Sequence, residues 1–385
     1  MFQSPAAVLT VLSALTAFFF WLEARSGWRL FRYVPPLIFI YGIPVVLSNT
    51  GVIPTESPVY SGMRSYALPA FLTLMLLSLD CGRAVRVMGR GIFVMLAGSA
   101  GVVIGAPIAY AIVRGGLSPD AWKGFGALAG SWIGGTGNLA AVAGALEAPP
   151  EEVGLAVLAD NLVYIVWLPL LLASKNLADR FGRFSKVSAG RLDRMEAAAK
   201  EAEAETRAPA MRDYLALATA AFAATWLARS IAGRLPPAEP VLSTGTWEVL
   251  LITTIGIALS FTPMKRVPGS QPLSTAMVYL FVGSMGARAE LSGLDRAPWF
   301  VAGAFIWIAV HGIVVLAAAR ALRVDVHTAA ISSAANIGGI ASAPIVAAHH
   351  RKTLVPVSIL MALIGYAIGN YLAILTAQLC YWVGH

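Results

Sequence analysis

The sequence predicts an all-α membrane protein with two inverted halves, each made of five transmembrane helices plus one broken or re-entrant glycine-rich segment. Three observations support this fold class. Hydrophobic residues make up 58% of the 385 residues and charged residues only 12%, a balance unlike that of soluble domains. A glycine-rich motif recurs at matching positions in the two halves. The basic residues gather in the short segments between apolar runs.

The apolar runs are long enough to cross a bilayer. Runs such as 91–113 and 299–319 carry almost no charge and reach the roughly 20 residues that span about 30 Å of hydrocarbon. The expected segments are 5–24, 33–49, 65–80, 91–114, 121–146, 152–174, 212–230, 246–263, 271–288, 298–321, 326–348 and 353–380. The first has no basic region before it and is followed by Glu23 and Arg25 rather than a cleavage site, so we expect a helix of the mature protein.

The segments divide into a first membrane half, 1–174, and a second, 212–385. The charged linker 175–211 between them is rich in Ala, Glu, Lys and Arg and predicts a solvated helix or tether outside the bilayer. The halves look related because Trp132-Ile-Gly-Gly-Thr-Gly-Asn138 aligns without gaps to Asn336-Ile-Gly-Gly-Ile-Ala-Ser342. An internal repeat of this kind is typical of secondary transporters.

The basic residues indicate how the two halves are oriented. Clusters follow the apolar segments that end near 24, 80, 174, 263, 321 and 348, and the positive-inside rule assigns all of them to the cytoplasm. If every segment crossed the membrane, the cluster in the linker would lie on the wrong side. If 121–146 and 326–348 enter and leave on the same side, every cluster becomes cytoplasmic, the N-terminus lies outside and the halves are inverted. Arg229 and Arg234 do not follow this pattern.

The two glycine-rich segments form the expected binding site. Irregular backbone at membrane depth survives only where it is buried in protein or lines a wet cavity, and broken helices offer N–H groups to an anion and carbonyls to a cation. Ordinary small-residue helix packing is the alternative, but the matching positions of the two segments favour a site. The candidate substrate-binding residues are Ser131, Gly134, Gly135, Thr136, Gly137, Asn138, Ser333, Asn336, Gly338, Gly339 and Ser342, with Ser332 as a further polar residue.

Few ionisable residues lie inside the spans. Asp160 and Asn161 stand mid-segment just after the first broken element and are candidates for binding the coupling ion, with Asp160 as a proton carrier or sodium ligand. The alternative for Asp160 is an acid that is hydrogen bonded to a neighbouring helix. Asp80 is a coupling-ion candidate or the ion-pair partner of Arg83, and Asn370 is a further polar candidate.

Composition disfavours several other classes. Cys81 and Cys380 match neither a disulfide framework nor a metal-ligand spacing, so we expect no metal beyond a transported cation and no cofactor other than Na+ as coupling ion. The net charge of +8 fits anionic lipid, and no nucleic-acid partner is expected. We do not expect the protein to be an enzyme. A hydrolase using Ser131 or Ser333 with His311 is a remote alternative, because nothing in the sequence places a base near either serine.

At Ile133-Gly-Gly-Thr-Gly-Asn138 and Ile337-Gly-Gly-Ile-Ala-Ser342 the chain resembles the cation/proton antiporter and anion transporter superfamily, and more distantly the bacterial sodium symporters for citrate and glutamate. The whole chain looks like the YjcL-like family of uncharacterised integral membrane proteins, domain of unknown function 819. The second motif departs from the pattern with Ala341 in place of glycine. The resemblance implies transport and scaffold domains interleaved across both halves, a scaffold that often dimerises, and elevator-like movement. It also implies an acid where Asp160 stands.

The expected function is secondary active transport in the bacterial cytoplasmic (inner) membrane. The expected reaction is symport of a small organic anion, or of an amino-acid-like or peptide-like solute, with Na+ or H+. The expected partners are that solute or ion, the lipid bilayer and a second copy of the chain in a homodimer. A cation/proton antiporter that uses Asp160 is the main alternative, because the spans offer little fixed positive charge to an anion.

Overall fold

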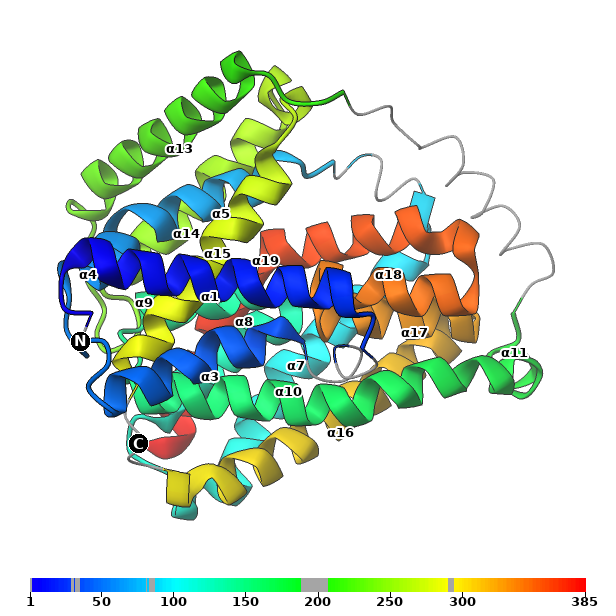
Figure 1. Cartoon of the computed structure of the whole chain (residues 1–385). Coiled ribbons are helices and arrows are strands. Elements are labelled where there is room, and N and C mark those ends of the chain that lie inside the picture. Colours follow the sequence, from blue (N-terminus) through cyan, green and yellow to red (C-terminus); the bar gives the residue numbers. More distant parts are fainter. Residues whose placement is uncertain are drawn as a thin grey trace.

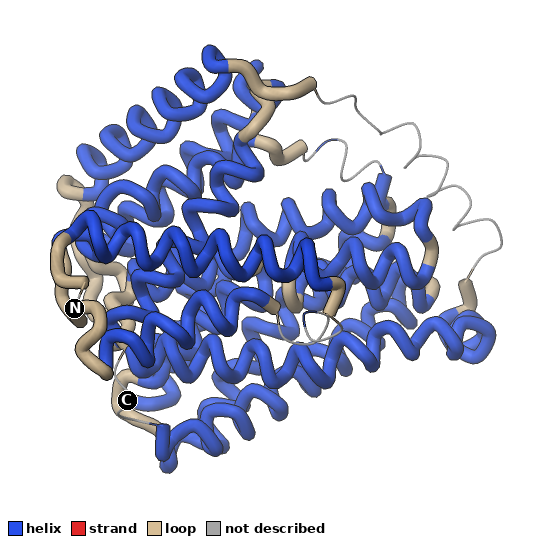
Figure 2. Tube along the Cα trace, viewed as in Figure 1, coloured by secondary structure: helices blue, strands red, loops and turns tan. Residues whose placement is uncertain are grey.

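Helices joined by loops make up most of the described parts of the protein, which contain no strand (Figure 2). The computed structural model describes residues 2–28, 31, 35–80, 82, 87–187, 207–289 and 294–385. Cys81, Arg83 and linker residues 188–206 lie outside these ranges. The α-helices are α1 (Pro5–Ser26), α3 (Pro36–Asn49), α4 (Pro58–Gly62), α5 (Leu68–Leu77), α7 (Gly91–Val113), α8 (Ala121–Gly134), α9 (Thr136–Ala145), α10 (Pro150–Ala173), α11 (Ala178–Ser185), α13 (Met211–Ala232), α14 (Thr244–Ser260), α15 (Ser270–Arg288), α16 (Ala297–Leu322), α17 (Val326–Asn336), α18 (Gly339–His350) and α19 (Val355–Gly384).

Several of these helices have the length and composition of membrane spans. Among the described residues, six stretches are long and apolar enough to cross a bilayer, and α3 and α14 are shorter apolar helices. The six are Pro5–Ser26, Gly91–Gly116, Pro150–Ser185, Met211–Ala232, Ala297–Leu322 and Lys352–Gly384. Each apolar segment expected from the sequence coincides with a helix or a pair of helices. The prediction of an all-α membrane protein is therefore confirmed.

The helices pack in two bundles, and each bundle takes helices from both halves of the chain. The core bundle comprises α7, α8, α9, α10, α16, α17, α18 and α19, and the flanking bundle comprises α1, α3, α4, α5, α13, α14 and α15. Packing repeats between the halves, because α3 packs on α15 as α14 packs on α5, and α10 packs on α16 as α19 packs on α7. Figure 1 shows α13 of the flanking bundle and α16 of the core bundle at opposite edges of the molecule.

Both glycine-rich segments are helical hairpins. In the first hairpin (α8–α9), a Cβ placed on Gly130 would lie 2.8 Å from the Asn138 carbonyl oxygen. Along one straight helix these residues would be about 12 Å apart, so α9 folds back along α8. In the second hairpin (α17–α18), His327 at the start of α17 and His350 at the end of α18 bring their Nδ1 atoms within 3.0 Å. The two ends of each broken segment therefore lie together.

The hairpins open at opposite ends of the molecule. Glu147, two residues beyond the end of α9, precedes α10, which is 24 residues long and leads to the linker. Lys175, in the turn that follows α10, donates a hydrogen bond to the His349 carbonyl at the base of the second hairpin at 2.7 Å. The length of α10 therefore separates the base of the first hairpin from the base of the second.

Arg229, which does not follow the charge pattern, is neutralised inside the flanking bundle. Between α4 and α5 the chain makes one π-helical stretch, Met63–Ala67. Arg229 on α13 donates to the Ser65 carbonyl in this stretch, and its Nε lies 2.9 Å from Glu248 Oε1 on α14. The wider π-helical geometry exposes backbone groups that an α-helix would pair, so Arg229 has a structural role there.

An ion pair joins the flanking bundle to the base of the first hairpin. Arg64 Nη2 lies 2.8 Å from Glu147 Oε1 and 3.0 Å from the Gly144 carbonyl oxygen. The side chains of Arg64 and Glu147 are 40% and 70% exposed. Because water screens so exposed a pair, Arg64→Gln is expected to lower the free energy of unfolding by no more than about 1 kcal/mol. Thermal unfolding of the purified protein at low and high salt measures the loss.

Glu147→Gln is the matched variant for this pair and should show the same small loss, with no further loss in the double variant. A drop of several kcal/mol in either single variant would mean that the pair, and not apolar packing, holds the base of the hairpin.

Candidate functional site

The tips of the two hairpins meet inside the core bundle, although they are far apart in the sequence. A Cβ placed on Gly339 would lie 3.5 Å from the Gly135 Cα. Tyr366 on α19 packs against both tips, since its Cε1 would lie 2.9 Å from a Cβ on Gly135 and 3.2 Å from one on Gly339. The candidate site thus consists of two helix breaks with one aromatic ring packed against both.

The paired glycines are needed for different reasons in the two hairpins. Gly135 has a φ of 77°, and Gly338 and Gly339 have φ values of 104° and 56°. Residues with a Cβ rarely adopt these angles. Gly134 has no such angle, but a Cβ there would lie 2.5 Å from Asn138 Nδ2. The first tip therefore needs one glycine for backbone conformation and one for packing, whereas the second tip needs two for conformation.

Ala341, where the second motif lacks a glycine, leaves the tip unaffected. The matching residue Gly137 packs on the flanking bundle, because a Cβ there would lie 2.9 Å from Met75 Sδ on α5. Ala341 instead lies on the exposed face of α18. The departure from the motif changes a packing surface and not the helix break.

The start of each second helix offers backbone donors at the tips. Gly135 and Gly338 precede α9 and α18, and neither supplies a side-chain cap. The first N–H groups of a helix have no partner within it and carry the positive end of the helix dipole. Thr136 begins α9 and is half-buried, and Ser342 lies buried in the first turn of α18. An anion at the tips would meet these backbone donors and hydroxyls.

Asp160 binds the first hairpin. Its Oδ2 accepts a hydrogen bond from Ser131 Oγ at 2.7 Å and its Oδ1 accepts one from Trp132 Nε1 at 2.9 Å, both from the end of α8. Among the described residues no basic side chain forms an ion pair with Asp160. Asn161, the neighbouring candidate, donates to the Val157 carbonyl of its own helix at 2.7 Å. The two adjacent candidates therefore do not share a ligand-binding position.

One face of α10 contacts both hairpins. Asp160, Tyr164 and Trp167 occupy positions i, i+4 and i+7 of α10, so they share a face. Tyr164 contacts the second tip, where its Cε2 would lie 3.4 Å from a Cβ on Gly338, and Trp167 Nε1 donates to Ser333 Oγ at 3.0 Å. Tyr164 and Trp167 are not among the residues expected from the sequence. Their helical spacing from Asp160 is the signal that identifies them.

His311 lies beside Ser333, a proximity that nothing in the sequence indicated. His311 Nε2 is 2.9 Å from Ser333 Oγ, and Nδ1 is 3.0 Å from the Gly98 carbonyl oxygen. A carbonyl can only accept, so Nδ1 carries the proton and Nε2 accepts from the serine hydroxyl. The serine oxygen also accepts from Trp167, and both His311 and Ser333 are buried. This link joins α7, α16, α10 and α17.

The other polar candidates have separate partners. Asn336 lies 2.7 Å from Ser99 Oγ on α7. Asp80, beyond the end of α5 in the flanking bundle, forms an ion pair with Lys265 at 3.4 Å, and its expected partner Arg83 lies outside the described residues. In the part of the chain that the structure describes, no three His, Cys, Asp or Glu side chains are grouped to hold a metal ion.

Two further glycines let the first hairpin pack directly on α19. A Cβ on Gly365 would lie 2.2 Å from the Ile133 carbonyl oxygen, and one on Gly369 would lie 2.2 Å from Asn138 Nδ2. Asn138 Nδ2 donates to the Tyr366 carbonyl at 3.1 Å. Gly365 and Gly369 are one turn apart, a spacing typical of close helix contacts in membranes. That spacing is the sequence signal for a contact that was not expected.

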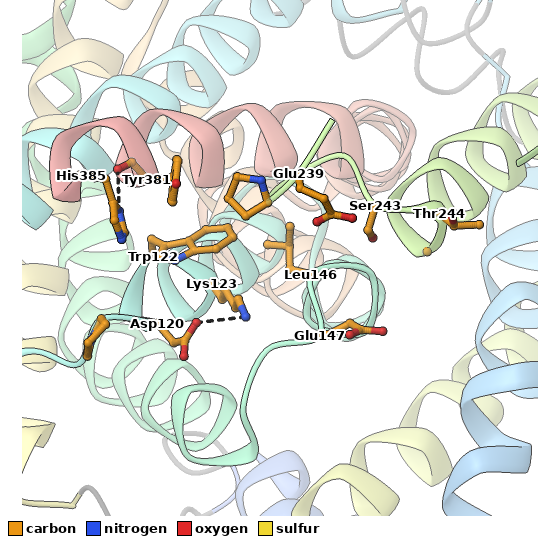
Figure 3. Close-up of a pocket in the computed structure, with 13 residues that line it drawn as sticks. Asp120, Trp122, Lys123, Leu146, Glu147, Glu239, Ser243, Thr244, Tyr381 and His385 are labelled. Carbon is orange, nitrogen blue, oxygen red and sulfur yellow. Dashed lines mark hydrogen bonds and ion pairs between the residues drawn. The ribbon is translucent and has the colours of Figure 1, made fainter. Parts of the chain in front are cut away.

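Two cavities flank the base of the first hairpin. One, of about 530 Å³, lies among the start of α8, the end of α9, the connection from α13 to α14 and the last residues of α19 (Figure 3). Figure 3 shows Asp120 and Lys123, an ion pair at 3.0 Å, in its lining. The other, of about 250 Å³, is lined in part by Arg64 and Arg288. None of the candidate residues expected from the sequence lines either cavity.

Comparisons with known proteins give a consistent assignment. The family model described as protein of unknown function (DUF819) matches residues 10–381. The uncharacterised membrane protein YjcL of Bacillus subtilis (strain 168) is 30% identical over 363 residues, which cover 91% of this chain and 90% of the relative. The likeness therefore extends over both halves and both hairpins.

Proposed function

This multi-pass membrane protein belongs to the DUF819 family of proteins of unknown function, and from this premise we propose that it is a cation-coupled symporter. The proposed substrate is a small organic anion or an amino-acid-like or peptide-like solute, and the proposed coupling ion is Na+ or H+. The observation that carries the proposal is the contact between the hairpin tips at Gly135 and Gly339. Two facing helix breaks supply donors for an anion and carbonyls for a cation in one place.

In this proposal the core bundle is the transport domain and the flanking bundle the scaffold domain, interleaved across residues 1–174 and 212–385. The core bundle moves against the flanking bundle and carries the tips from one side of the membrane to the other, in an elevator-like movement. The placement of both hairpins in one bundle supports this division. The repeated packing between the halves supports an inverted repeat.

We place the linker 175–211 and the base of the second hairpin in the cytoplasm, and the N-terminus and the base of the first hairpin outside a bacterial inner membrane. Lys175 and His349 support this placement, because they bring the basic linker end to the second hairpin. Both hairpins are then re-entrant. We also propose a homodimer formed through the flanking bundle, where α13 exposes Leu215, Phe222 and Trp226 to lipid or to a second copy.

The proposal is tested first by thermal stabilisation of the purified protein with small carboxylates, amino acids and short peptides, at several pH values and with or without Na+. A ligand present at 100 times its Kd is expected to stabilise by about 2.7 kcal/mol. Solutes that stabilise are then tested for uptake into proteoliposomes. We expect accumulation only when an inward Na+ or proton gradient is imposed. Uptake that is independent of both gradients would exclude coupling.

A cation/proton antiporter is the second candidate, favoured by Asp160. Its carboxylate lies in the core bundle, where two hydrogen-bond donors are its partners and no described basic side chain forms an ion pair with it. Such a group is suited to exchange a proton for a cation. Cation-driven proton movement without any solute would favour this mechanism.

We propose no enzymatic role for the Ser333–His311 link. The imidazole uses both nitrogens in hydrogen bonds, and the serine oxygen receives the Trp167 N–H as well. A nucleophile needs a free line of approach to a substrate, and these side chains are buried. Covalent labelling of Ser333 by an active-site serine probe would contradict this assignment.

A further inference from the structure

We propose that the first hairpin and α19 form a binding site for Na+ in which the side-chain amide oxygens of Asn138 and Asn370 are ligands. This inference rests on the proposed function, because it assigns the coupling ion and its position. Both asparagines are fully buried, and among the described residues neither amide oxygen has a hydrogen-bond partner. Buried amide oxygens without a partner are uncommon in native proteins and indicate a ligand.

The hydrogen bond of Asn138 determines where its oxygen points. Its Nδ2 lies 3.1 Å from the Tyr366 carbonyl oxygen on α19. A carbonyl only accepts, so the nitrogen of Asn138 must face it and the amide oxygen lies on the other branch. This orientation leaves the oxygen available to a cation.

The same reasoning applies to Asn370. Its Nδ2 lies 2.8 Å from Thr253 Oγ1 on α14, and that hydroxyl donates its only proton to the Val249 carbonyl at 2.7 Å. Thr253 must therefore accept from Asn370, so the amide nitrogen faces Thr253 and the oxygen is unpaired. The bond also joins the core bundle to the flanking bundle, so an ion at Asn370 would lie where the two bundles meet.

Asn138 contacts the turn of α19 that carries Asn370. The Tyr366 carbonyl that accepts from Asn138 stands four residues before Asn370 and is the position that accepts the backbone N–H of Asn370 in a regular helix. Asn138 also packs on Gly369, the residue directly before Asn370. Asn138 therefore packs against the turn of α19 that carries Asn370, whose own amide reaches Thr253 on α14.

The end of α8 adds negative potential near this turn of α19. The last carbonyls of a helix have no partner within it and carry the negative end of the helix dipole. α8 ends at Gly134, and its Ile133 carbonyl lies against Gly365, one turn of α19 before Gly369. Neutral oxygen ligands with a helix C-terminus are suited to a hard cation. The oxygens of Asp160 already accept two hydrogen bonds, so this site does not require them.

The test is the Na+ dependence of thermal unfolding of the purified full chain, measured by titration with NaCl against KCl and choline chloride at constant ionic strength. We expect Na+, and not K+ or choline, to raise the melting temperature of the wild type. Asn138→Ala and Asn370→Ala are expected to weaken the apparent Na+ affinity at least about tenfold. Asn49→Ala on α3 removes an asparagine whose amide donates to the Val45 and Ala289 carbonyls within the flanking bundle, so it should keep the wild-type affinity.

Asn370→Asp separates a ligand from a structural role, because it keeps an oxygen and adds charge while it loses the donor to Thr253. This variant should bind Na+ at least as tightly as the wild type. If Asn370 were only structural, Asn370→Ala and Asn370→Asp would both lower the melting temperature and neither would change Na+ affinity selectively. Equal melting temperatures of the wild type in NaCl and KCl would overturn the proposal. If folded Asn138→Ala or Asn370→Ala bound Na+ with wild-type affinity, the proposal would also be overturned. If these two variants do not fold, loss of the Na+ effect in Asn370→Asp would overturn it.

These outcomes are distinct from failure of the proposed function. Solute uptake driven only by a proton gradient, without Na+ binding, would overturn the Na+ site and keep the symporter. Na+ binding that needs Asn138 and Asn370, in a protein that transports no solute, would keep the site and remove symport.

Discussion

Gly365→Ala is expected to lower the free energy of unfolding by about 3 kcal/mol, at the upper end of overpacking costs, and to abolish transport. The added Cβ would lie 2.2 Å from the Ile133 carbonyl oxygen. That atom belongs to the backbone at the end of α8, so the first hairpin must move away from α19 as a whole. The displacement would also separate Asn138 from Tyr366. Thermal unfolding and proteoliposome uptake measure the two effects.

Gly42→Ala on α3 is the matched control for this change. Gly42 is also a helical glycine, but no atom lies within 4 Å of a Cβ placed there. The substitution should stabilise by about 0.5–1 kcal/mol, because alanine is the better helix former. If Gly365→Ala behaved like Gly42→Ala, the close contact between the first hairpin and α19 would not exist.

Asp160→Leu is expected to lower the free energy of unfolding by about 2–6 kcal/mol. The change leaves the Ser131 hydroxyl and the Trp132 indole N–H without their acceptor inside the core bundle. Each unpaired buried donor costs about 1–3 kcal/mol. Asp160→Asn is the control, because its oxygen can accept from Trp132 while its nitrogen donates to Ser131. It should therefore retain nearly all of the wild-type stability.

The same pair of variants separates the two candidate functions. In the symporter with a Na+ site at Asn138 and Asn370, Asp160→Asn keeps solute uptake because the acid positions α8 and does not carry the ion. In the antiporter, Asp160→Asn removes the exchanging group and abolishes cation exchange in a folded protein. Parallel measurements of unfolding, solute uptake and cation-driven proton movement decide between them.

The helices and the two breaks follow from local properties of the sequence. Whether about 20 residues cross a bilayer depends on their summed hydropathy, and each expected apolar segment coincides with a described helix or pair of helices. A glycine at a helix break is recognisable because only glycine adopts positive φ without strain, as Gly135, Gly338 and Gly339 do. The fold class and the position of the candidate tips therefore could be predicted.

The partners of the polar side chains could not be predicted in the same way. Asp160 and Asn161 are neighbours in the sequence, yet one binds α8 and the other its own backbone. Ser333 meets His311, a pairing that the sequence raised only as a remote alternative, without evidence that the two residues are close. A span that is apolar on all sides carries no stripe that shows which face turns inward, so its rotation depends on packing with distant helices.

The sequence by itself thus determined the membrane class, the helical segments and the glycine breaks, because hydropathy and backbone conformation act over one segment at a time. Only the tertiary structure decided that the two tips meet, that Tyr366 packs against both and that Asn138 binds the turn of α19 that carries Asn370. Those contacts join residues from both halves, and close packing across Gly365 and Gly369 sets their distances.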